Sequence, residues 1–311
     1  MSNNYPLEKI KKSRILVIGD LMVDRYWFGQ VDRISPEAPV PVVHVKKNEN
    51  RLGGAANVAS NIVSLGAQAT LMGVVGLDEP ANILTNLCDE HNIKTNLVVD
   101  DKAETTIKMR VLGGQQQLLR IDFEKFPSDE IAKNLCEIAL PLIQEHDLVV
   151  FSDYNKGALK FIREMISHAT SLNIPVLVDP KGADYSRYSG ASLITPNRKE
   201  MEQAVGLWNT EEELTQKAQE QRNKHKLGAI LVTRSERGMT LFDDNGRRHQ
   251  DAQAKEVFDV SGAGDTVLAT LAVTHAAGLD LKDAIIWANK AGGIVVGKLG
   301  TSTVSAKEIM Q

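Results

Sequence analysis

A glycine-containing loop that ends in a carboxylate precedes an apolar helical segment late in the chain. The loop reads Asp259-Val-Ser-Gly-Ala-Gly-Asp265, and the apolar run 266–277 follows it directly. Free N–H groups and the positive dipole at a helix N-terminus bind anions, and glycine lets the backbone approach a phosphate closely. A carboxylate there would repel the phosphate unless it had another task, such as accepting the proton of an attacking hydroxyl. The pattern indicates phosphoryl transfer, with an acidic helix cap as the alternative.

A second segment of small residues, Gly53-Gly54-Ala-Ala-Asn57, precedes another helical pattern. Asn57 offers both a donor and an acceptor, which suits a hydroxyl-rich ligand. Asp20 and Asp24 follow the first apolar strand, where their carboxylates could accept hydrogen bonds from sugar hydroxyls. The simpler alternatives are an Asn near a helix start and, for the two aspartates, turn positions.

Two polar loops follow later strands of the pattern. Asn197 and Glu200 are three residues apart on one helical face, so they could position magnesium-bound water near a nucleotide phosphate. The same pair fits a capping box, and the two interpretations are compatible. The loop from Thr233 through Ser235 to Gly238 suits nucleotide contact, although by itself it indicates only a turn.

Several basic residues lie at predicted strand ends or in exposed strand segments. One or more of them could bind a second phosphate on the substrate, whereas a solvated surface is the simpler interpretation of each alone. These candidates are Arg33, Arg110, Arg120, Lys156 and Lys181.

Short apolar runs alternate with amphipathic segments along the chain, which predicts an α/β fold with a doubly wound, mostly parallel sheet and helices on both faces. Such sheets bind ligands beyond the carboxyl ends of their strands. The predicted strands are 14–19, 70–75, 147–151, 176–179, 192–195 and 229–233, and the predicted helices are 57–65, 82–91, 129–145, 159–172, 211–224, 266–277 and 281–296.

Two segments break this alternation and read as exposed, antiparallel strands. Segment 26–47 contains a proline-rich stretch, and segment 104–122 has Gly113-Gly114 as a turn. They predict a small second sheet over the main one. We expect it to act as a lid that excludes water, the alternative being a decorative edge sheet.

Composition excludes several classes of partner and cofactor. The 311 residues are 42% hydrophobic and 24% charged, with a net charge of -4, so neither nucleic acid nor a membrane is the expected partner. The polar N-terminal segment lacks the apolar run of a signal peptide. Cys88 and Cys136 are expected to be reduced core thiols of a cytoplasmic protein. Segment 292–299 imitates a P-loop but lacks its Ser or Thr, and neither a dinucleotide fingerprint nor a zinc spacing occurs.

Taken in order, these motifs resemble those of the ribokinase-like (PfkB) family of sugar kinases. Gly53-Gly54-Ala-Ala-Asn57 looks like its N-terminal signature, the loop 259–265 like its C-terminal signature, and Asn197-Arg-Lys-Glu200 like its Asn-x-x-Glu motif. The resemblance covers essentially the whole chain. It implies one kinase domain over 1–311, lid segments at about 21–50 and 104–122, and a homodimer formed through the lid.

A narrower set of motifs is similar to the bacterial heptose 7-phosphate kinases. The similarity implies that ATP phosphorylates D-glycero-β-D-manno-heptose 7-phosphate at its anomeric hydroxyl, a step toward ADP-heptose and the lipopolysaccharide core. Such kinases occur alone or as the N-terminal half of a bifunctional protein, so a chain ending at Gln311 is expected to be a stand-alone kinase or an excised half. The motifs are Asp20-Leu-Met-Val-Asp24-Arg-Tyr, the segment 33–41, Ser152-Asp-Tyr-Asn-Lys156-Gly157, Asp179-Pro-Lys181-Gly182 and the segment 298–304.

The resemblance also implies a role for each matching residue, with ATP and Mg²⁺ as the cofactors. Asp265 would be the base, beside an anion hole formed by Gly262, Ala263 and Gly264. The nucleotide side would comprise Asn197, Glu200, Thr233, Ser235 and Gly238, with Glu200 reaching the metal through water. Sugar hydroxyls would meet Asp20, Asp24, Gly53, Gly54 and Asn57. The 7-phosphate would meet Arg110, Lys156 and Lys181. The C-terminal signature has Val-Ser where Thr-Thr is usual, a change that leaves the anion hole intact.

Two alternatives remain open from the sequence. One is a kinase of the same fold that acts on another sugar phosphate, sugar or nucleoside, because the sequence does not specify stereochemistry. The other is a non-catalytic ligand-binding member of the fold.

Overall fold

The computed structural model describes residues 4–114, 116–253 and 257–311. A large sheet contains β1 (Arg14–Gly19), β4 (Gln68–Gly76), β5 (Lys94–Asp100), β8 (Leu148–Ser152), β9 (Val176–Asp179), β10 (Leu193–Ile194), β11 (Ile230–Thr233), β12 (Met239–Asp243) and β13 (Gly246–Gln250). A small sheet contains β2 (Leu21–Ile34), β3 (Pro41–Gly54), β6 (Glu104–Gly113) and β7 (Gln116–Lys125). The helices are α1 (Leu7–Ile10), α2 (Ala55–Ser64), α3 (Glu79–Glu90), α4 (Asp129–Ile143), α5 (Ile162–Ser171), α6 (Arg198–Val205), α7 (Glu211–Lys224), α8 (Ala263–Ala276), α9 (Leu281–Val295) and α10 (Ala306–Met310), with short 3₁₀ turns η1 (Tyr185–Tyr188) and η2 (Ser235–Arg237).

The large sheet has the order β13-β12-β11-β10-β9-β8-β1-β4-β5. Neighbouring strands from β11 through to β5 are parallel, and β12 pairs antiparallel with both β11 and β13. This arrangement confirms the predicted doubly wound, mostly parallel sheet, since each parallel crossover needs a helix or a long connection.

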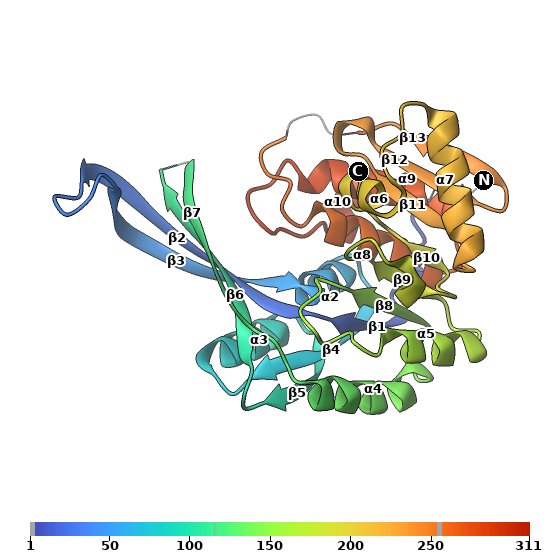
Figure 1. Ribbon diagram of the computed structural model, residues 1–311, viewed down its shortest axis with the longest axis horizontal. Helices are drawn as coiled ribbons and strands as arrows, with labels where there is room; N and C mark the ends of the chain where they lie inside the picture. The colour runs from blue at the N-terminus through green and yellow to red at the C-terminus, as the bar shows by residue number, and fades with distance from the viewer. Residues whose placement is uncertain (1–3, 115, 254–256) are drawn as a thin grey trace.

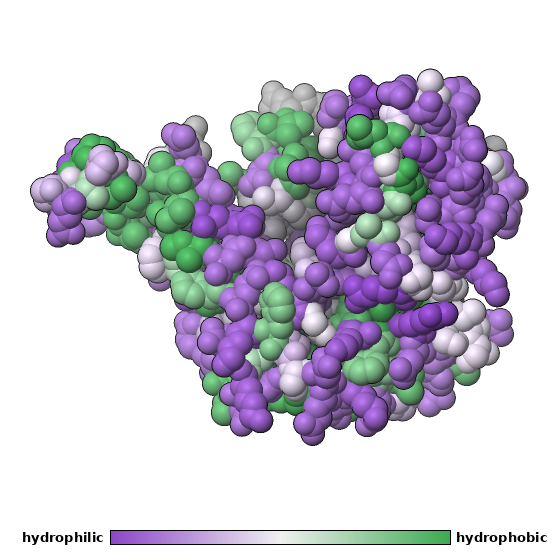
Figure 2. All heavy atoms as spheres, in the orientation of Figure 1, coloured by the Kyte–Doolittle hydropathy of each residue, from purple (hydrophilic) through white to green (hydrophobic). Residues whose placement is uncertain are grey.

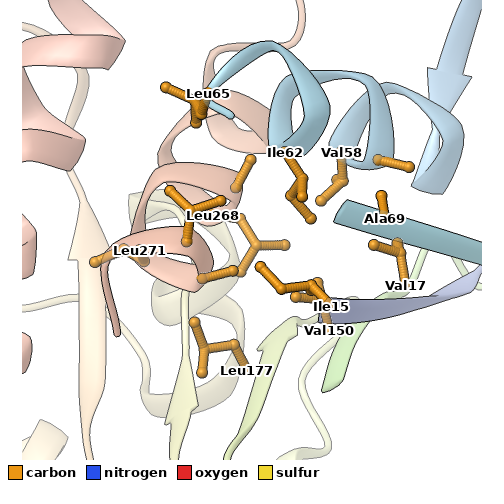
Figure 3. Close-up of a cluster of buried hydrophobic side chains, with 14 of the residues drawn as sticks. Ile15, Val17, Val58, Ile62, Leu65, Ala69, Val150, Leu177, Leu268 and Leu271 are labelled. Atoms are coloured by element: carbon orange, nitrogen blue, oxygen red, sulfur yellow. The ribbon is translucent and has the colours of Figure 1, made fainter. Parts of the chain in front are cut away.

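Alternate residues of β1 enter two different hydrophobic cores, one on each face of the sheet. Ile15 and Val17 join a core with α2, α3, α8 and α9, whereas Leu16 and Ile18 join a core with α4, α5, α6 and α7. The continuous apolar run is therefore the signature of a strand covered on both sides. Figure 3 shows Ile62 of α2 and Leu268 of α8 meeting over the first of these faces.

The small sheet, which we call the lid, projects from the body of the molecule (Figure 1). Its hairpins β2–β3 and β6–β7 are antiparallel as predicted, but β2 and β6, which join the hairpins, run parallel. The expectation of antiparallel strands throughout is therefore wrong at this junction, because the chain passes through α2, β4, α3 and β5 before β6 begins.

Three strands of the large sheet were not predicted. The sequence placed the last strand at 229–233, but the hairpin β12–β13 follows it, and β5 adds an edge strand. The segment Gly246–Gln250 reads Gly-Arg-Arg-His-Gln, so it has no apolar alternation to mark it as a strand.

Two further expectations concern the buried thiols and the membrane. Cys88 and Cys136 are free and buried, in α3 and α4 respectively, in agreement with the prediction. Across residues 4–114, 116–253 and 257–311, no helix is both long enough and apolar enough to cross a bilayer.

Candidate active site

The carboxyl ends of β1, β8 and β9 meet at one edge of the large sheet. The Asp20 N–H donates to the Ser152 carbonyl at 3.2 Å, and the Asp153 N–H donates to the Asp179 carbonyl at 3.1 Å. Further along this edge, the Thr233 N–H donates to the Pro196 carbonyl at 3.0 Å. Side chains that follow these strands therefore lie side by side although the sequence separates them widely, as expected for this class of sheet.

Asp265 is buried in the first turn of α8, where two side chains bind its carboxylate. Asn57 of α2 donates from Nδ2 to Oδ2 at 2.7 Å, and the Tyr154 hydroxyl, in the loop after β8, donates to Oδ1 at 3.0 Å. Burial raises the pKa of Asp265 to about 6 against the opposing effect of these two donors. Each oxygen keeps a second lone pair, so the carboxylate can still accept a proton near neutral pH.

Asn57 uses both ends of its side-chain amide for hydrogen bonds within the protein. Its Nδ2 is used by Asp265, and its Oδ1 accepts from Asn61 Nδ2 at 3.3 Å. It is the third residue of α2, whose N-cap is Gly54, so it lies near the helix start, as the simpler alternative expected. Contact with a sugar hydroxyl remains a prediction for its remaining hydrogen-bonding capacity.

The loop before α8 has the conformation that an anion site requires. Gly262 is the N-cap with φ +76°, and a Cβ at this position would lie 2.8 Å from Asn57 Nδ2, so the position favours glycine. Ala263 N–H already donates to the Val260 carbonyl at 3.2 Å, so it is the least available of the three predicted anion-hole donors. Gly264 lies in the first helical turn, where N–H groups point out of the helix end.

Asp259 ties this loop to the C-terminal segment. Its carboxylate accepts N–H bonds from Ser261 and Gly300, both at 2.9 Å. Although partial burial acts to raise its pKa, these bonds outweigh burial and lower it. Asp259 therefore favours the ionised form in the folded state, the reverse of Asp265.

Asp20 orders the loop after β8. Its carboxylate accepts backbone N–H bonds from Tyr154 at 2.8 Å, Lys156 at 3.0 Å and Ala158 at 3.2 Å. Burial raises its pKa to about 6 despite these donors. Its predicted contact with a sugar hydroxyl remains a prediction, whereas its position shows how Tyr154 is held near Asp265.

Basic side chains gather where the lid joins the large sheet. Arg110 of β6 pairs with Asp24 of β2 at 2.6 Å, and its guanidinium lies over the Tyr26 ring. Lys108, two residues earlier on the same strand, places its Nζ 4.9 Å from the centroid of the Tyr154 ring, and burial lowers its pKa. The sequence did not single out Lys108, because one lysine in an exposed-looking strand carries no local signal.

The remaining predicted cations differ in position. Lys156 joins Glu124 of β7 at 2.6 Å, close to the lid base. Lys181 instead pairs with Glu200 at 2.8 Å, so the structure places it with the predicted nucleotide side. Arg120 pairs with Asp122, and Arg33 is exposed toward the lid tip, roughly 30 Å along β2 from Asp24 at about 3.3 Å per residue.

The predicted nucleotide side is assembled beside Lys181. Asn197 and Glu200 form a complete capping box at the start of α6, and Asn197 bridges to Thr233 of β11. Ser235 and Gly238 close a tight turn in which the Gly238 N–H donates to the Ser235 carbonyl at 3.0 Å. These five residues therefore line one stretch of the sheet edge, and their nucleotide contacts remain predictions.

Direct metal binding finds little support in the side chains. Glu200 Oε1 accepts from Lys181 and Glu200 Oε2 accepts the Asn197 N–H, so both oxygens of this carboxylate already have protein partners. Within the described parts of the chain, no group of three His, Cys, Asp or Glu residues is arranged to hold an ion. This donor set fits a Mg²⁺ ion held mainly by phosphates and water.

One contact between the lid and the C-terminal segment was not predicted. Arg51 of β3 donates to the Leu299 carbonyl at 2.7 Å, and its guanidinium carbon lies 4.9 Å from the centroid of the Tyr26 ring. The Thr301 N–H also donates to the Tyr26 hydroxyl at 3.4 Å. The lid base is thus joined to the segment that Asp259 holds.

The opposite pKa shifts of Asp265 and Asp259 predict opposite effects on stability. The pKa of Asp265 is 3.8 unfolded and about 6 folded, so its ionisation penalises the folded state. This penalty is absent below about pH 4, grows as pH rises, and is complete above pH 6. Asp265→Asn should therefore raise the free energy of unfolding at pH 7, by on the order of 1–3 kcal/mol, and have little effect at pH 4. The Asn can accept from Asn57 and donate to Tyr154, so it fits the site.

Asp259→Asn is the matched control, because the lowered pKa of Asp259 makes its ionised form stabilising above its unfolded pKa. This variant should unfold more easily at pH 7, with the difference from wild type shrinking as pH falls. Urea unfolding of both variants between pH 4 and pH 8 measures the effect. A gap that does not change with pH for Asp265→Asn would contradict the assignment of a buried, ionised carboxylate.

Comparison with known proteins supports the chemistry suggested by this geometry. A D-beta-D-heptose 7-phosphate kinase of Bordetella bronchiseptica is 59% identical over 307 residues, covering 99% of this chain and 98% of that protein. The bifunctional protein HldE of Haemophilus influenzae Rd is 49% identical over 302 residues, and the match spans 97% of this chain but 63% of HldE.

Solved structures share the fold at much lower sequence identity. Phosphofructokinase-2 from Escherichia coli, in complex with potassium, matches with a TM-score of 0.81 at 20% identity, over 96% of each chain. Arabidopsis thaliana ribokinase, complexed with ribose and ATP, matches with a TM-score of 0.76 at 18% identity, over 96% of this chain and 97% of that one. The model of the pfkB family of carbohydrate kinases matches residues 12–308, and this chain belongs to that family.

Proposed function

We propose that this protein transfers the terminal phosphoryl group of ATP to the anomeric hydroxyl of D-glycero-β-D-manno-heptose 7-phosphate. The product is the 1,7-bisphosphate, used for ADP-heptose and the lipopolysaccharide core. The observation that carries the kinase chemistry is the buried Asp265 carboxylate, held by two neutral donors at the start of α8. The sugar is supported by 59% identity, over nearly the whole chain, to a protein named as a heptose 7-phosphate kinase.

In this proposal Asp265 removes the proton from the anomeric hydroxyl as that oxygen attacks the γ-phosphorus of ATP. The O–H bond breaks and its proton passes to the carboxylate; a new O–P bond forms, and the electron pair of the broken P–O bond leaves with ADP. The N–H groups of Gly262 and Gly264, with the dipole of α8, stabilise the charge on the transferring group. Asp24, Gly53, Gly54 and Asn57 are proposed to orient the sugar beside this base, and Asp20 holds the loop that carries Tyr154.

On the nucleotide side, Asn197, Thr233, Ser235 and Gly238 are proposed to contact ATP. Mg²⁺ bound with ATP would neutralise charge on the phosphate oxygens during transfer. Glu200 would hold it through water, and Lys181, paired with Glu200, is placed to bind an ATP phosphate rather than the sugar phosphate.

The sugar 7-phosphate is proposed to bind the cations at the lid base. Lys108 is the best-placed of them, because its Nζ lies against the Tyr154 ring while Tyr154 bonds the base. Arg110 and Lys156 lie nearby, and each is paired with a carboxylate in the structure. Both cations have further N–H donors with which they can bind a phosphate. Burial lowers the pKa of Lys108, so an incoming dianion is the partner that would restore its preference for the charged form.

Replacing the base tests the reaction directly. Asp265→Asn should lower kcat by about 10²–10⁴-fold, because the amide cannot accept the hydroxyl proton, while ATP and sugar phosphate still bind. For wild type, kcat/KM should fall about tenfold per pH unit below the pKa of about 6, as the base becomes protonated.

Coupled kinetics and calorimetric titration measure turnover and binding in this variant. Asp244→Asn, in the exposed turn between β12 and β13, is the control and should be unaffected. Wild-type protein that binds ligands but turns over no sugar with ATP would favour the non-catalytic alternative.

Removing the positive charge of Lys108 at the lid base tests whether this region binds the phosphate of the sugar. Lys108→Met should raise the KM for heptose 7-phosphate about 10–100-fold, consistent with loss of a charge-assisted bond, and change kcat less. With unphosphorylated heptose the two proteins should perform alike. The control is Lys46→Met, an exposed lysine on β3.

A panel of phosphorylated and unphosphorylated sugars completes the test of specificity. Activity on unphosphorylated sugars alone would overturn the heptose phosphate assignment. If Lys108→Met loses activity equally with heptose 7-phosphate and with unphosphorylated heptose, Lys108 does not bind the phosphate.

The lid is also proposed to form a homodimer in the cytoplasm. Its outer part exposes apolar side chains. Figure 2 shows hydrophobic surface, in green, along the projecting strands. Among the residues that the structure describes, the outer edges of β3 and β7 pair with no further strand, an arrangement that a partner can cover. The exposed apolar residues of the lid include Val31, Ile34, Val40, Val45, Leu119 and Phe123.

Leu119→Glu should convert a dimer to a monomer, because it places a charge in the proposed apolar contact. Light scattering coupled to size exclusion should give twice the chain mass for wild type and one chain mass for the variant. Leu207→Glu, at a leucine outside the lid that is even more exposed than Leu119, should leave the mass unchanged. A monomeric wild-type protein at micromolar concentration would contradict the dimer.

A further inference from the structure

We propose that Asn61 and Thr266 are positioning residues, which fix the direction of the Asn57 amide and thereby keep a hydrogen-bond donor aimed at Asp265. The inference rests on the proposed function of Asp265 as the base. It adds two residues, neither of which matches a signature position in the sequence, to the set on which turnover depends.

The side chains of Thr266, Asn61, Asn57 and Asp265 form a continuous chain of hydrogen bonds between α2 and α8, which we call the relay. Thr266 Oγ1 donates to Asn61 Oδ1 at 3.0 Å, and Asn61 Nδ2 donates to Asn57 Oδ1 at 3.3 Å and to the Asn57 carbonyl at 3.0 Å. Asn57 Nδ2 then donates to Asp265 Oδ2 at 2.7 Å. All four side chains are buried.

The two ends of the relay determine its direction. An ionised carboxylate and a backbone carbonyl can only accept, so Asn57 presents its NH₂ to the ionised Asp265, and Asn61 presents its NH₂ to the Asn57 carbonyl. A rotated Asn61 amide would place its oxygen against that carbonyl oxygen. With Asn61 held in this direction, its Oδ1 faces the Thr266 hydroxyl, which donates to it.

The apolar surroundings make these polar side chains costly unless they are fully bonded. Val58 and Ile62 of α2 face Leu268 and Leu271 of α8 in the same interface (Figure 3). Apolar residues there would pack without any hydrogen-bond requirement, whereas a buried amide with unmet partners is destabilising. The relay satisfies its own members and delivers one N–H to the carboxylate.

Other groups face Asp265 from the elements around it. They are Asp24 of β2, Lys108 of β6, Tyr154 after β8 and Asp179 of β9. From α2, the group in contact is the neutral amide of Asn57. Weakening the hydrogen bond from Asn57 leaves these charged groups in place. A change in the pKa of Asp265 in such a variant can therefore be attributed to that hydrogen bond.

The test compares the same substitution at two threonines of α8. Thr266→Val removes the donor to Asn61, whereas Thr270→Val removes a hydroxyl that donates only within the helix, to the Thr266 carbonyl at 2.7 Å. We expect Thr266→Val to lower kcat about three- to tenfold and to move the acidic limb of the kcat/KM profile to higher pH, since the carboxylate loses support. KM for ATP should not change, and Thr266→Ser should restore the profile. Thr270→Val should match wild type in both readouts.

Asn61→Leu is the second variant, expected to show the same shift with a larger loss of kcat. If it does not fold, Thr266→Val alone decides. An active wild type with an unchanged acidic limb in Thr266→Val overturns the relay and leaves the kinase assignment intact. A wild type that phosphorylates no sugar overturns the kinase assignment and the relay with it.

Discussion

A buried carboxylate that must remain ionisable is the constraint on which the rest of the site depends. The Asp265 carboxylate is buried, and it accepts hydrogen bonds from Asn57 on one side and Tyr154 on the other. Each donor is in turn held by a different part of the chain, Asn57 by α2 and Tyr154 by the loop that Asp20 organises. A buried charge is tolerated only when such partners are fixed. The sheet edge, the starts of α2 and α8 and the loop after β8 must therefore keep the relative positions that bring both donors to the carboxylate.

The lid base extends this network toward the C-terminal segment. Asp24 and Arg110 pair between neighbouring strands, and two guanidiniums contact Tyr26, one from β6 and one from β3. Arg51 then reaches the Leu299 carbonyl, beside the loop that Asp259 holds. The site is therefore bordered by contacts among three segments that are remote in sequence, each satisfying polar groups of the next.

Local patterns were enough to predict much of this structure. Apolar runs gave six strands of the large sheet, and the small-residue motifs correctly marked the starts of α2 and α8. The pair Asn57–Asp265, however, joins residues 208 positions apart, and no local pattern encodes that bond. Tyr154 and Lys108 look ordinary in sequence because their importance comes from neighbours supplied by other strands. The pairing of Lys181 with Glu200 is hidden for the same reason, because position after a strand does not reveal which carboxylate a flexible side chain will meet. The strand β13 lacked any apolar signal because none of its five residues is buried, so no position in it requires an apolar side chain.

The direct junction of β3 and α2 has a consequence for how the family can vary. Gly54 ends the strand and Ala55 begins the helix, so no connecting loop lies between the lid and Asn57. An inserted or deleted residue there would rotate the helix start by about 100°, at 3.6 residues per turn, and carry Asn57 away from the carboxylate. The turn between β2 and β3 has no such coupling, because it lies at the far tip of the hairpin. Evolution is therefore free to lengthen or shorten the lid at its tip, while the base of the same hairpin is held to a fixed count of residues.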